Sequence, residues 1–205
     1  MNRVVYLIRH SKSLRVNNEY NYESLQLQNE KNPLSIEGEQ AAKEKMINDE
    51  LTNLDIIISS NYVRAICTAK YLTANNNKEV TVIPNFGERK FGINSWDELP
   101  KNFGFRQWQD NNYKMPRGES ILEVKSRCFN ELNKLLNKDY KRIAIVSHAM
   151  AILSLLKTWC SISISEEKKV EIKFKEKVIN IDKIDHCMIF KLEFDNRKLI
   201  DISVI

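Results

Sequence analysis

The sequence is poor in the residues that mark fibrous and low-complexity chains. Its 205 residues include only five glycines and four prolines, which excludes a collagen-like repeat, and no internal repeat is visible. Hydrophobic residues make up 42% and charged residues 29%, a balance that excludes an intrinsically disordered chain. A chain of this length fits one α/β domain better than two. We therefore expect a single catalytic domain over residues 1–205.

Long apolar runs and clustered cysteines are also missing. No stretch approaches the roughly 18 consecutive apolar residues of a membrane span, and the N-terminus lacks a basic region followed by a long apolar one. No CxxC spacing links the four cysteines, Cys67, Cys128, Cys160 and Cys187. Such scattered cysteines beside apolar segments are typical of buried thiols in a reducing compartment and indicate neither zinc nor a disulfide. These features predict a soluble, cytoplasmic protein without a membrane partner.

The sequence has no block of basic residues. The 32 lysines and arginines exceed the 27 acidic residues by enough to give a net charge of +5, and the lysines are spread among glutamates. This pattern argues against a nucleic-acid partner. A mild positive excess does favour the attraction of small anionic ligands.

Short β-rich runs alternate with longer segments of helical spacing. The expected strands are 4–8, 55–59, 80–83 and 143–146, and a C-terminal hairpin is expected over 187–194 and 199–204. The expected helices are one that begins after Ser35, one over 62–72 capped by Ser60 or Asn61, one over 121–136, and one over about 149–160. Alternation of this kind predicts an α/β fold, with a mostly parallel central sheet covered by helices on both faces.

Two segments, near 12–33 and 94–117, are polar and lack clear periodicity. The second holds five aromatic residues, Trp96, Phe103, Phe105, Trp108 and Tyr113. Aromatic side chains among polar ones indicate an ordered cover instead of a linker. Whether these aromatics only pack a lid or also select a substrate stays open.

Charged side chains follow each expected strand. The first strand leads into Arg9 and His10, the second reaches Arg64, the third reaches Glu88, and the fourth leads into His148. Ligands of open α/β sheets bind beyond the carboxyl ends of the strands. Arginines match phosphate oxygens, a neutral imidazole attacks phosphorus without a metal, and a glutamate can protonate the departing oxygen. The sequence therefore predicts phosphoryl transfer at this edge with no metal or cofactor.

These residues belong to motifs that stand in a characteristic order. The motifs are 7–11 (LIRHS), 32–38 (NPLSIEG), 59–65 (SSNYVRA), 88–92 (ERKFG), 118–120 (GES) and 146–149 (VSHA). Together they resemble the histidine phosphatase superfamily, also called phosphoglycerate-mutase-like proteins, and the resemblance runs from residue 4 to about residue 155. It implies a three-layer α/β/α fold of the phosphoglycerate-mutase-like type.

The resemblance also implies a role for each matching residue. His10 is the implied nucleophile that takes up the phosphoryl group. Glu88 is the implied proton donor to the leaving group and afterwards the base for water. The implied phosphate contacts are Arg9, Ser13, Asn17, Arg64 and His148. Three of these residues, Arg9, Arg64 and His148, are also implied to stabilise the charge that develops in the transition state.

Several positions keep a second interpretation. Ser11 stands where the family usually has glycine, so the backbone approach to phosphate differs at this point. Glu119 is a rival for the acid role of Glu88, or else a structural helix cap. His186 lies outside every motif and is interpreted as structural or solvent-exposed. Arg89 and Lys90 either help to bind a substrate's negative charge or are solvated side chains, and the second interpretation is favoured.

The sequence predicts a metal-independent phosphomonoesterase that works through a phosphohistidine on His10. The alternatives are a cofactor-dependent phosphoglycerate mutase and a catalytically weak regulator that binds a phosphorylated ligand. The expected substrate is a phosphorylated small molecule, with a phosphoprotein as the second possibility. The oligomeric state leaves no mark in the sequence.

Overall fold

The computed structural model describes residues 2–16, 22–167 and 169–205. Its centre is a six-stranded sheet of order β3-β2-β4-β1-β8-β9. The strands are β1 (Asn2–Arg9), β2 (Ile56–Ser59), β3 (Val80–Val82), β4 (Arg142–Ser147), β8 (Ile189–Asp195) and β9 (Lys198–Val204). The first four in the sheet order pair in parallel, and the C-terminal hairpin β8–β9 adds antiparallel pairs. The predicted mostly parallel sheet is therefore confirmed.

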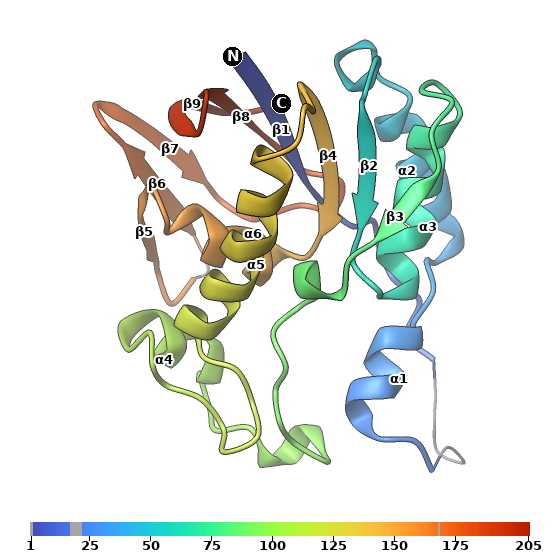
Figure 1. Cartoon of the computed structure of the whole chain (residues 1–205). Helices are drawn as coiled ribbons and strands as arrows, with labels where there is room; N and C mark the ends of the chain where they lie inside the picture. Colours follow the sequence, from blue (N-terminus) through green and yellow to red (C-terminus); the bar gives the residue numbers. More distant parts are fainter. Residues whose placement is uncertain (1, 17–21, 168) are drawn as a thin grey trace.

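Both faces of the sheet are covered by helices. Along β1, Val5 and Leu7 belong to one buried core, whereas Tyr6 and Ile8 belong to another. The first core is shared with α5 (Ile121–Leu136) and α6 (Ala149–Leu156), and the second with α2 (Ile36–Met46) and α3 (Val63–Thr73). Because successive side chains of a strand point to opposite faces, this alternation confirms the three-layer α/β/α architecture (Figure 1).

The helix starts follow the sequence closely, with one exception. Ser35 and Ser120 cap α2 and α5 through their hydroxyls, and Glu123 completes a capping box at the start of α5. The cap residue of α3 is instead Tyr62, so the prediction of Ser60 or Asn61 is wrong. The reason is that the Ser60 hydroxyl bonds to a histidine of the site described below.

The helix predicted over about 149–160 is shorter in the structure. It ends at Leu156, and the chain then tightens into bonds from the backbone N–H of Thr158 and Trp159 to carbonyls three residues earlier. The Trp159 ring packs edge-on against Phe129 and Phe194, with ring centres 5.8 and 5.6 Å apart. The tryptophan thus anchors the turn that leads away from the helix.

A second sheet follows this turn, and the sequence did not predict it. It consists of the antiparallel strands β5 (Ser161–Ile164), β6 (Val170–Phe174) and β7 (Lys177–Ile181). The buried side chains of β6, Val170, Ile172 and Phe174, join the core shared by α5 and α6. Figure 1 shows this small sheet beside the main one.

The two polar segments contain short helices, not only irregular chain. The first holds α1 (Leu25–Lys31), and the second holds the 3₁₀ turn η3 (Trp96–Glu98) and α4 (Phe103–Gln109). In Figure 1 the arrowheads of β2 and β4 point to the end of the molecule where α1 and α4 lie. Both segments therefore cover the carboxyl edge of the sheet. Among the described helices none is long and apolar enough to cross a membrane.

Candidate active site

Three adjacent strands end together at this edge. Arg9 at the end of β1 lies opposite Ser147 of β4, and Ser59 of β2 lies opposite Val146. The backbone N–H of His10 donates to the Ser147 carbonyl at 2.9 Å. His10 and His148, which follow β1 and β4, are brought together with ring centres 4.9 Å apart.

The two ring nitrogens of His10 have different partners. Nδ1 lies 2.6 Å from the backbone oxygen of Ser11, and because a carbonyl only accepts, Nδ1 carries the ring proton. Nε2 accepts a hydrogen bond from Arg64 Nε at 3.1 Å. Burial, followed by the Arg64 and Arg9 guanidinium groups, lowers the pKa of His10 well below its usual range. The imidazole is therefore neutral, with its lone pair on Nε2.

Arg64 connects the two histidines. Besides His10, it contacts His148, where Nη2 lies 3.4 Å from Nδ1, and it donates from Nη1 to the Asn29 carbonyl of α1 at 2.6 Å. Its Cζ lies 4.6 Å from the centre of the Tyr62 ring. His148 is fully buried, and its Nε2 lies 2.8 Å from the Ser60 hydroxyl. Burial, and then the neighbouring His10 and Arg64, lower the pKa of His148 well below its usual range.

Arg9 lies on the other side of His10, next to the third histidine. It donates from Nη1 to the Ile184 carbonyl, and its Nη2 lies 3.3 Å from His186 Nε2. The His186 ring is 6.1 Å from the His10 ring, centre to centre. His186 is exposed, as the sequence analysis allowed, but it stands at the rim of the site. No motif in the sequence places His186 there, because the contact depends on how the chain enters β8.

The loop after His10 is held against α2. Ser11 is fully buried, and its hydroxyl donates to the Gly38 carbonyl at 2.7 Å, so the serine in place of glycine is accommodated. A Cβ on Gly38 would lie 2.0 Å from the Lys12 carbonyl oxygen, which explains the glycine at this position. Ser13 is half-buried and bridges to Leu34 through its backbone. Asn17 lies outside the described residues.

The two rival carboxylates have distinct surroundings. Glu88 accepts from the backbone N–H of Met150 at 3.4 Å, at the start of α6, and its charge raises the pKa of Arg9 and of Arg64 against the effect of burial. Glu119 binds Arg127 with both oxygens, at 2.7 and 3.0 Å, and also accepts from the backbone N–H of Lys90 at 2.8 Å. Glu88 thus lies among the arginines of the site, whereas Glu119 is committed to an ion pair.

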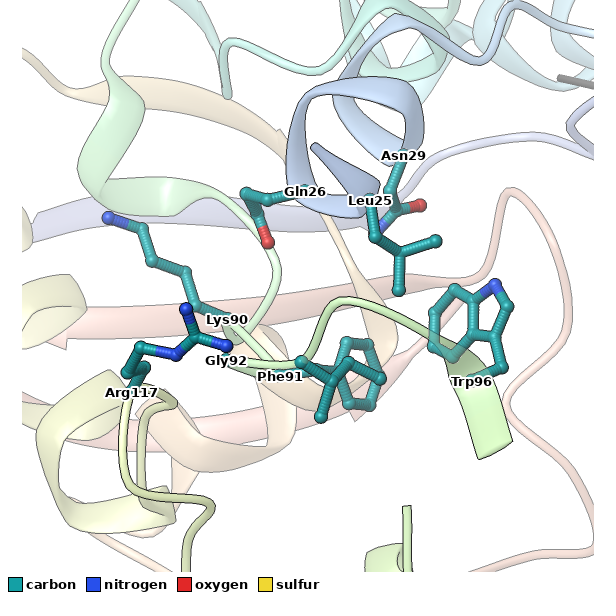
Figure 2. Close-up of a pocket in the computed structure, with 9 residues that line it drawn as sticks. Leu25, Gln26, Asn29, Lys90, Phe91, Gly92, Trp96 and Arg117 are labelled. Carbon is teal, nitrogen blue, oxygen red and sulfur yellow. The ribbon is translucent and has the colours of Figure 1, made fainter. Parts of the chain in front are cut away.

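Arg89 is buried, so its interpretation as a solvated side chain is wrong. Only 8% of its surface is exposed, and its Cζ lies 5.0 Å from the centre of the Phe91 ring. Lys90 is exposed as predicted. It lines a pocket of about 110 Å³ between α1 and the chain after Glu88. Figure 2 shows Lys90 and Arg117 on one side of this pocket and Trp96 on the opposite side.

Burial of His10 and His148 predicts a pH-dependent stability. The folded state keeps both rings neutral, whereas the unfolded chain binds protons near pH 6.5, so the free energy of unfolding falls as the pH drops below that value. Each ring is expected to contribute a loss of about 1.4 kcal/mol between pH 7.5 and 5.5. Urea unfolding at several pH values measures this, and His148→Asn is expected to reduce the pH dependence. An unfolding free energy that stays level down to pH 5.5 would contradict the prediction.

The fold and the site together define a class of protein. It is a three-layer α/β/α protein with a cluster of histidine and arginine side chains at the carboxyl edge of its sheet. The chain belongs to the histidine phosphatase superfamily (branch 1), whose family model matches residues 5–192. Within the described residues, no group of three or more histidine, cysteine, aspartate and glutamate side chains is placed to hold a metal ion.

Two relatives that match the chain carry different kinds of name, one that of a phosphatase and the other that of a phosphoglycerate mutase. The "Uncharacterized phosphatase PhoE" of Bacillus subtilis (strain 168) is 30% identical over 126 residues, which cover 60% of this chain and 63% of that protein. The match therefore spans less than two thirds of the relative. The "Probable phosphoglycerate mutase GpmB" of Cronobacter sakazakii is 26% identical over 177 residues, 82% of this chain and 80% of that protein.

Solved structures share the fold. A mycobacterial glucosyl-3-phosphoglycerate phosphatase in complex with inorganic phosphate superposes with a TM-score of 0.72 at 15% identity, covering 99% of this chain and 95% of that one. A phosphoglycerate mutase from Bacillus anthracis gives a TM-score of 0.66 at 15% identity, with coverage of 100% and 92%. The same architecture thus occurs in proteins named for hydrolysis and for phosphoryl transfer.

Proposed function

We propose that the protein is a metal-independent phosphomonoesterase that forms a phosphohistidine at Nε2 of His10. The observation that carries the proposal is the state of this ring: buried and neutral, with its proton on Nδ1 and its lone pair on Nε2 beside Arg64. A neutral imidazole held in this way is a competent nucleophile toward phosphorus and needs no metal to act.

The proposed reaction has two steps. In the first, His10 Nε2 attacks phosphorus, the bond to the ester oxygen breaks, and protonated Glu88 donates its proton to the departing oxygen. In the second, the Glu88 carboxylate takes a proton from water, the water oxygen attacks phosphorus, and the P–N bond breaks to release phosphate. Glu88 is then protonated again and His10 is free, so the cycle closes.

The cationic groups support the phosphoryl group in this scheme. The Arg64 Nε–H, which donates to His10, can donate to a phosphoryl oxygen instead, and this frees the lone pair for attack. Arg9 and His148 flank the same ring and complete the proposed oxygen contacts. Ser13 and Asn17 remain proposed further contacts from the resemblance alone.

Hydrolysis of p-nitrophenyl phosphate in the presence of EDTA tests the proposal. We expect phosphate release from the purified protein between mildly acidic and neutral pH, and no loss of rate on chelation, because the nucleophile is an imidazole nitrogen. Vanadate, which mimics the transferring phosphoryl group, is expected to inhibit. Absence of phosphate release across this pH range, or its abolition by EDTA, would contradict the proposal.

A phosphoglycerate mutase is the second candidate. The relative named as a probable mutase covers most of the chain, and residues 88–92 (ERKFG) resemble the corresponding mutase segment. Against it, the paired arginines that the mutases carry in the insert are missing from 94–117. A coupled assay with 3-phosphoglycerate and bisphosphoglycerate separates the two candidates. Efficient conversion to 2-phosphoglycerate would favour the mutase over the phosphatase.

A further inference from the structure

Glu88 lies on a stretch of chain outside the regular elements of the fold. The 3₁₀ turn η2 (Pro84–Phe86) ends two residues before it, and residues 88–93 form neither helix nor strand. The Ser147 hydroxyl of β4 donates to the Phe86 carbonyl at 2.6 Å and ties the end of η2 to the sheet. Because a general acid must lie within hydrogen-bond reach of the oxygen that it protonates, the position of Glu88 beyond this point needs further anchors.

Arg127 of α5 binds the backbone that leads into Glu88. It donates from Nη1 to the Asn85 and Gly87 carbonyls, at 2.7 and 3.0 Å. It also donates from Nη2 to the carbonyl of Glu88 itself, at 3.1 Å. One guanidinium thus fixes three of the four carbonyls from 85 to 88. These bonds are charge-assisted, which makes them stronger than bonds between neutral groups.

Arg127 is itself held by Glu119, through both carboxylate oxygens at 2.7 and 3.0 Å. Each of the two side chains is 18% exposed. The same carboxylate accepts from the backbone N–H of Lys90 at 2.8 Å, so the pair holds the chain before Glu88 through Arg127 and after it through Glu119. A glutamine at 119 can still accept from Arg127 through its amide oxygen, so the loss of Arg127 itself is the more severe change.

We propose that Arg127 is a positioning residue that holds Glu88 in place to protonate the departing oxygen. The inference rests on the proposed phosphatase function and extends it to a residue outside the motifs that carry the resemblance. A guanidinium suits this role because its planar fork of donors binds several acceptors in fixed directions. Displacement of a reacting group by about 1 Å costs up to about 10²-fold in rate, so the anchor of an acid matters as much as the acid.

Two substrates with different leaving groups test the inference. The nitrophenolate of p-nitrophenyl phosphate leaves without a proton, whereas the alkoxide of 2-phenylethyl phosphate needs one. In Arg127→Met we expect kcat/KM to fall about 10- to 10²-fold more for the alkyl ester than for the aryl ester, because Glu88 keeps its carboxyl group and loses its position. The ratio compares two substrates on one protein, so a general loss of folded enzyme does not change it. A ratio equal to that of the unaltered protein would overturn the inference.

Arg127→Lys separates the position of Glu88 from the charge beside it. Lysine keeps the positive charge next to Glu119, but its single nitrogen lacks the planar fork that binds the three carbonyls. We therefore expect the substrate ratio to stay shifted, as in Arg127→Met. Full recovery of the ratio in Arg127→Lys would overturn the inference, because the charge alone would then account for the effect.

Arg142→Met is the matched control. Arg142 is also half-buried, and it donates to two backbone carbonyls, those of Thr52 at 3.1 Å and Glu50 at 2.5 Å. It begins β4, at the opposite end of the strand from the residue that leads into His148. Its replacement removes the same charge and a similar set of bonds, so we expect a lower thermal midpoint and an unchanged substrate ratio. An equal shift of the ratio in Arg142→Met would overturn the inference, because it would reflect a loosened fold.

A double variant shows whether Arg127 acts through Glu88. In Glu88→Gln the proton is absent and its position no longer matters, so adding Arg127→Met is expected to leave the substrate ratio of Glu88→Gln unchanged. A further shift in the double variant would overturn the inference, since Arg127 would then act on another group. If Glu88→Gln shifts the ratio and Arg127→Met does not, the inference fails alone. If the unaltered protein hydrolyses neither ester, or Glu88→Gln leaves the ratio unchanged, the proposed function fails and the inference with it.

Discussion

His10→Ala is expected to lower kcat/KM for p-nitrophenyl phosphate by at least about 10⁴-fold, the scale seen when the nucleophile of a covalent mechanism is removed. His148 is not placed to substitute for it, since its Nε2 is hydrogen-bonded to Ser60 and its Nδ1 faces Arg64. Steady-state kinetics measures the loss. Near-ultraviolet circular dichroism and the thermal midpoint show whether the variant remains folded.

A milder variant and a trapping experiment serve as its controls. His186→Ala removes a histidine from the rim of the same site and leaves Nε2 of His10 intact, so a loss of only about tenfold is expected through the position of Arg9. Alkaline quenching during turnover is expected to leave one phosphoryl group on the peptide that contains His10, and acid to remove it. Activity of His10→Ala within tenfold of the parent would contradict the phosphohistidine mechanism.

The sequence predicts the elements whose ends carry local signals. The helix over 121–136 has the same bounds in the structure, because Ser120 and Glu123 form a capping box. The second sheet was missed although Val170, Ile172 and Phe174 alternate with charged residues, which is the pattern of a strand buried on one face. The three strands are only four or five residues long, and β5 (SISI) and β7 (KVINI) carry weaker patterns than β6, so their pairing in one sheet depends on packing against the larger core.

The residues of the site also divide into those that the sequence predicts and those that only the structure identifies. The residues that follow β1, β2 and β4 could be predicted to meet, because parallel strands end at one edge. The burial of Arg89 could not be predicted, since it depends on α4, whose Gly104 lies beside the guanidinium, and on the Phe91 ring under it. The contact between His186 and Arg9 likewise joins two segments that are far apart in the sequence. Local motifs thus indicate the chemistry, and long-range packing determines what surrounds it.

Glu88→Gln is expected to separate the two candidate acids by the leaving group of the substrate. For an alkyl phosphate, whose departing oxygen needs a proton, kcat/KM is expected to fall about 10²- to 10⁴-fold, the contribution of a positioned general acid. For p-nitrophenyl phosphate the fall is expected to be much smaller, because p-nitrophenolate leaves without a proton. The glutamine keeps the size of the side chain and can still accept from the Met150 N–H.

Glu119→Gln is the matched comparison, because Glu119 is paired with Arg127 whereas Glu88 contacts the Met150 N–H. Both oxygens of Glu119 bind Arg127, and Arg127 also donates to the Asn85 and Gly87 carbonyls that lead into Glu88. Weakening this pair is expected to cost about 2 kcal/mol of unfolding free energy. It is also expected to lower the rates for alkyl and aryl phosphates by a similar small factor, since Glu88 keeps both its carboxyl group and its contact with the Met150 N–H. A leaving-group dependence in Glu119→Gln that is absent from Glu88→Gln would reverse the two roles.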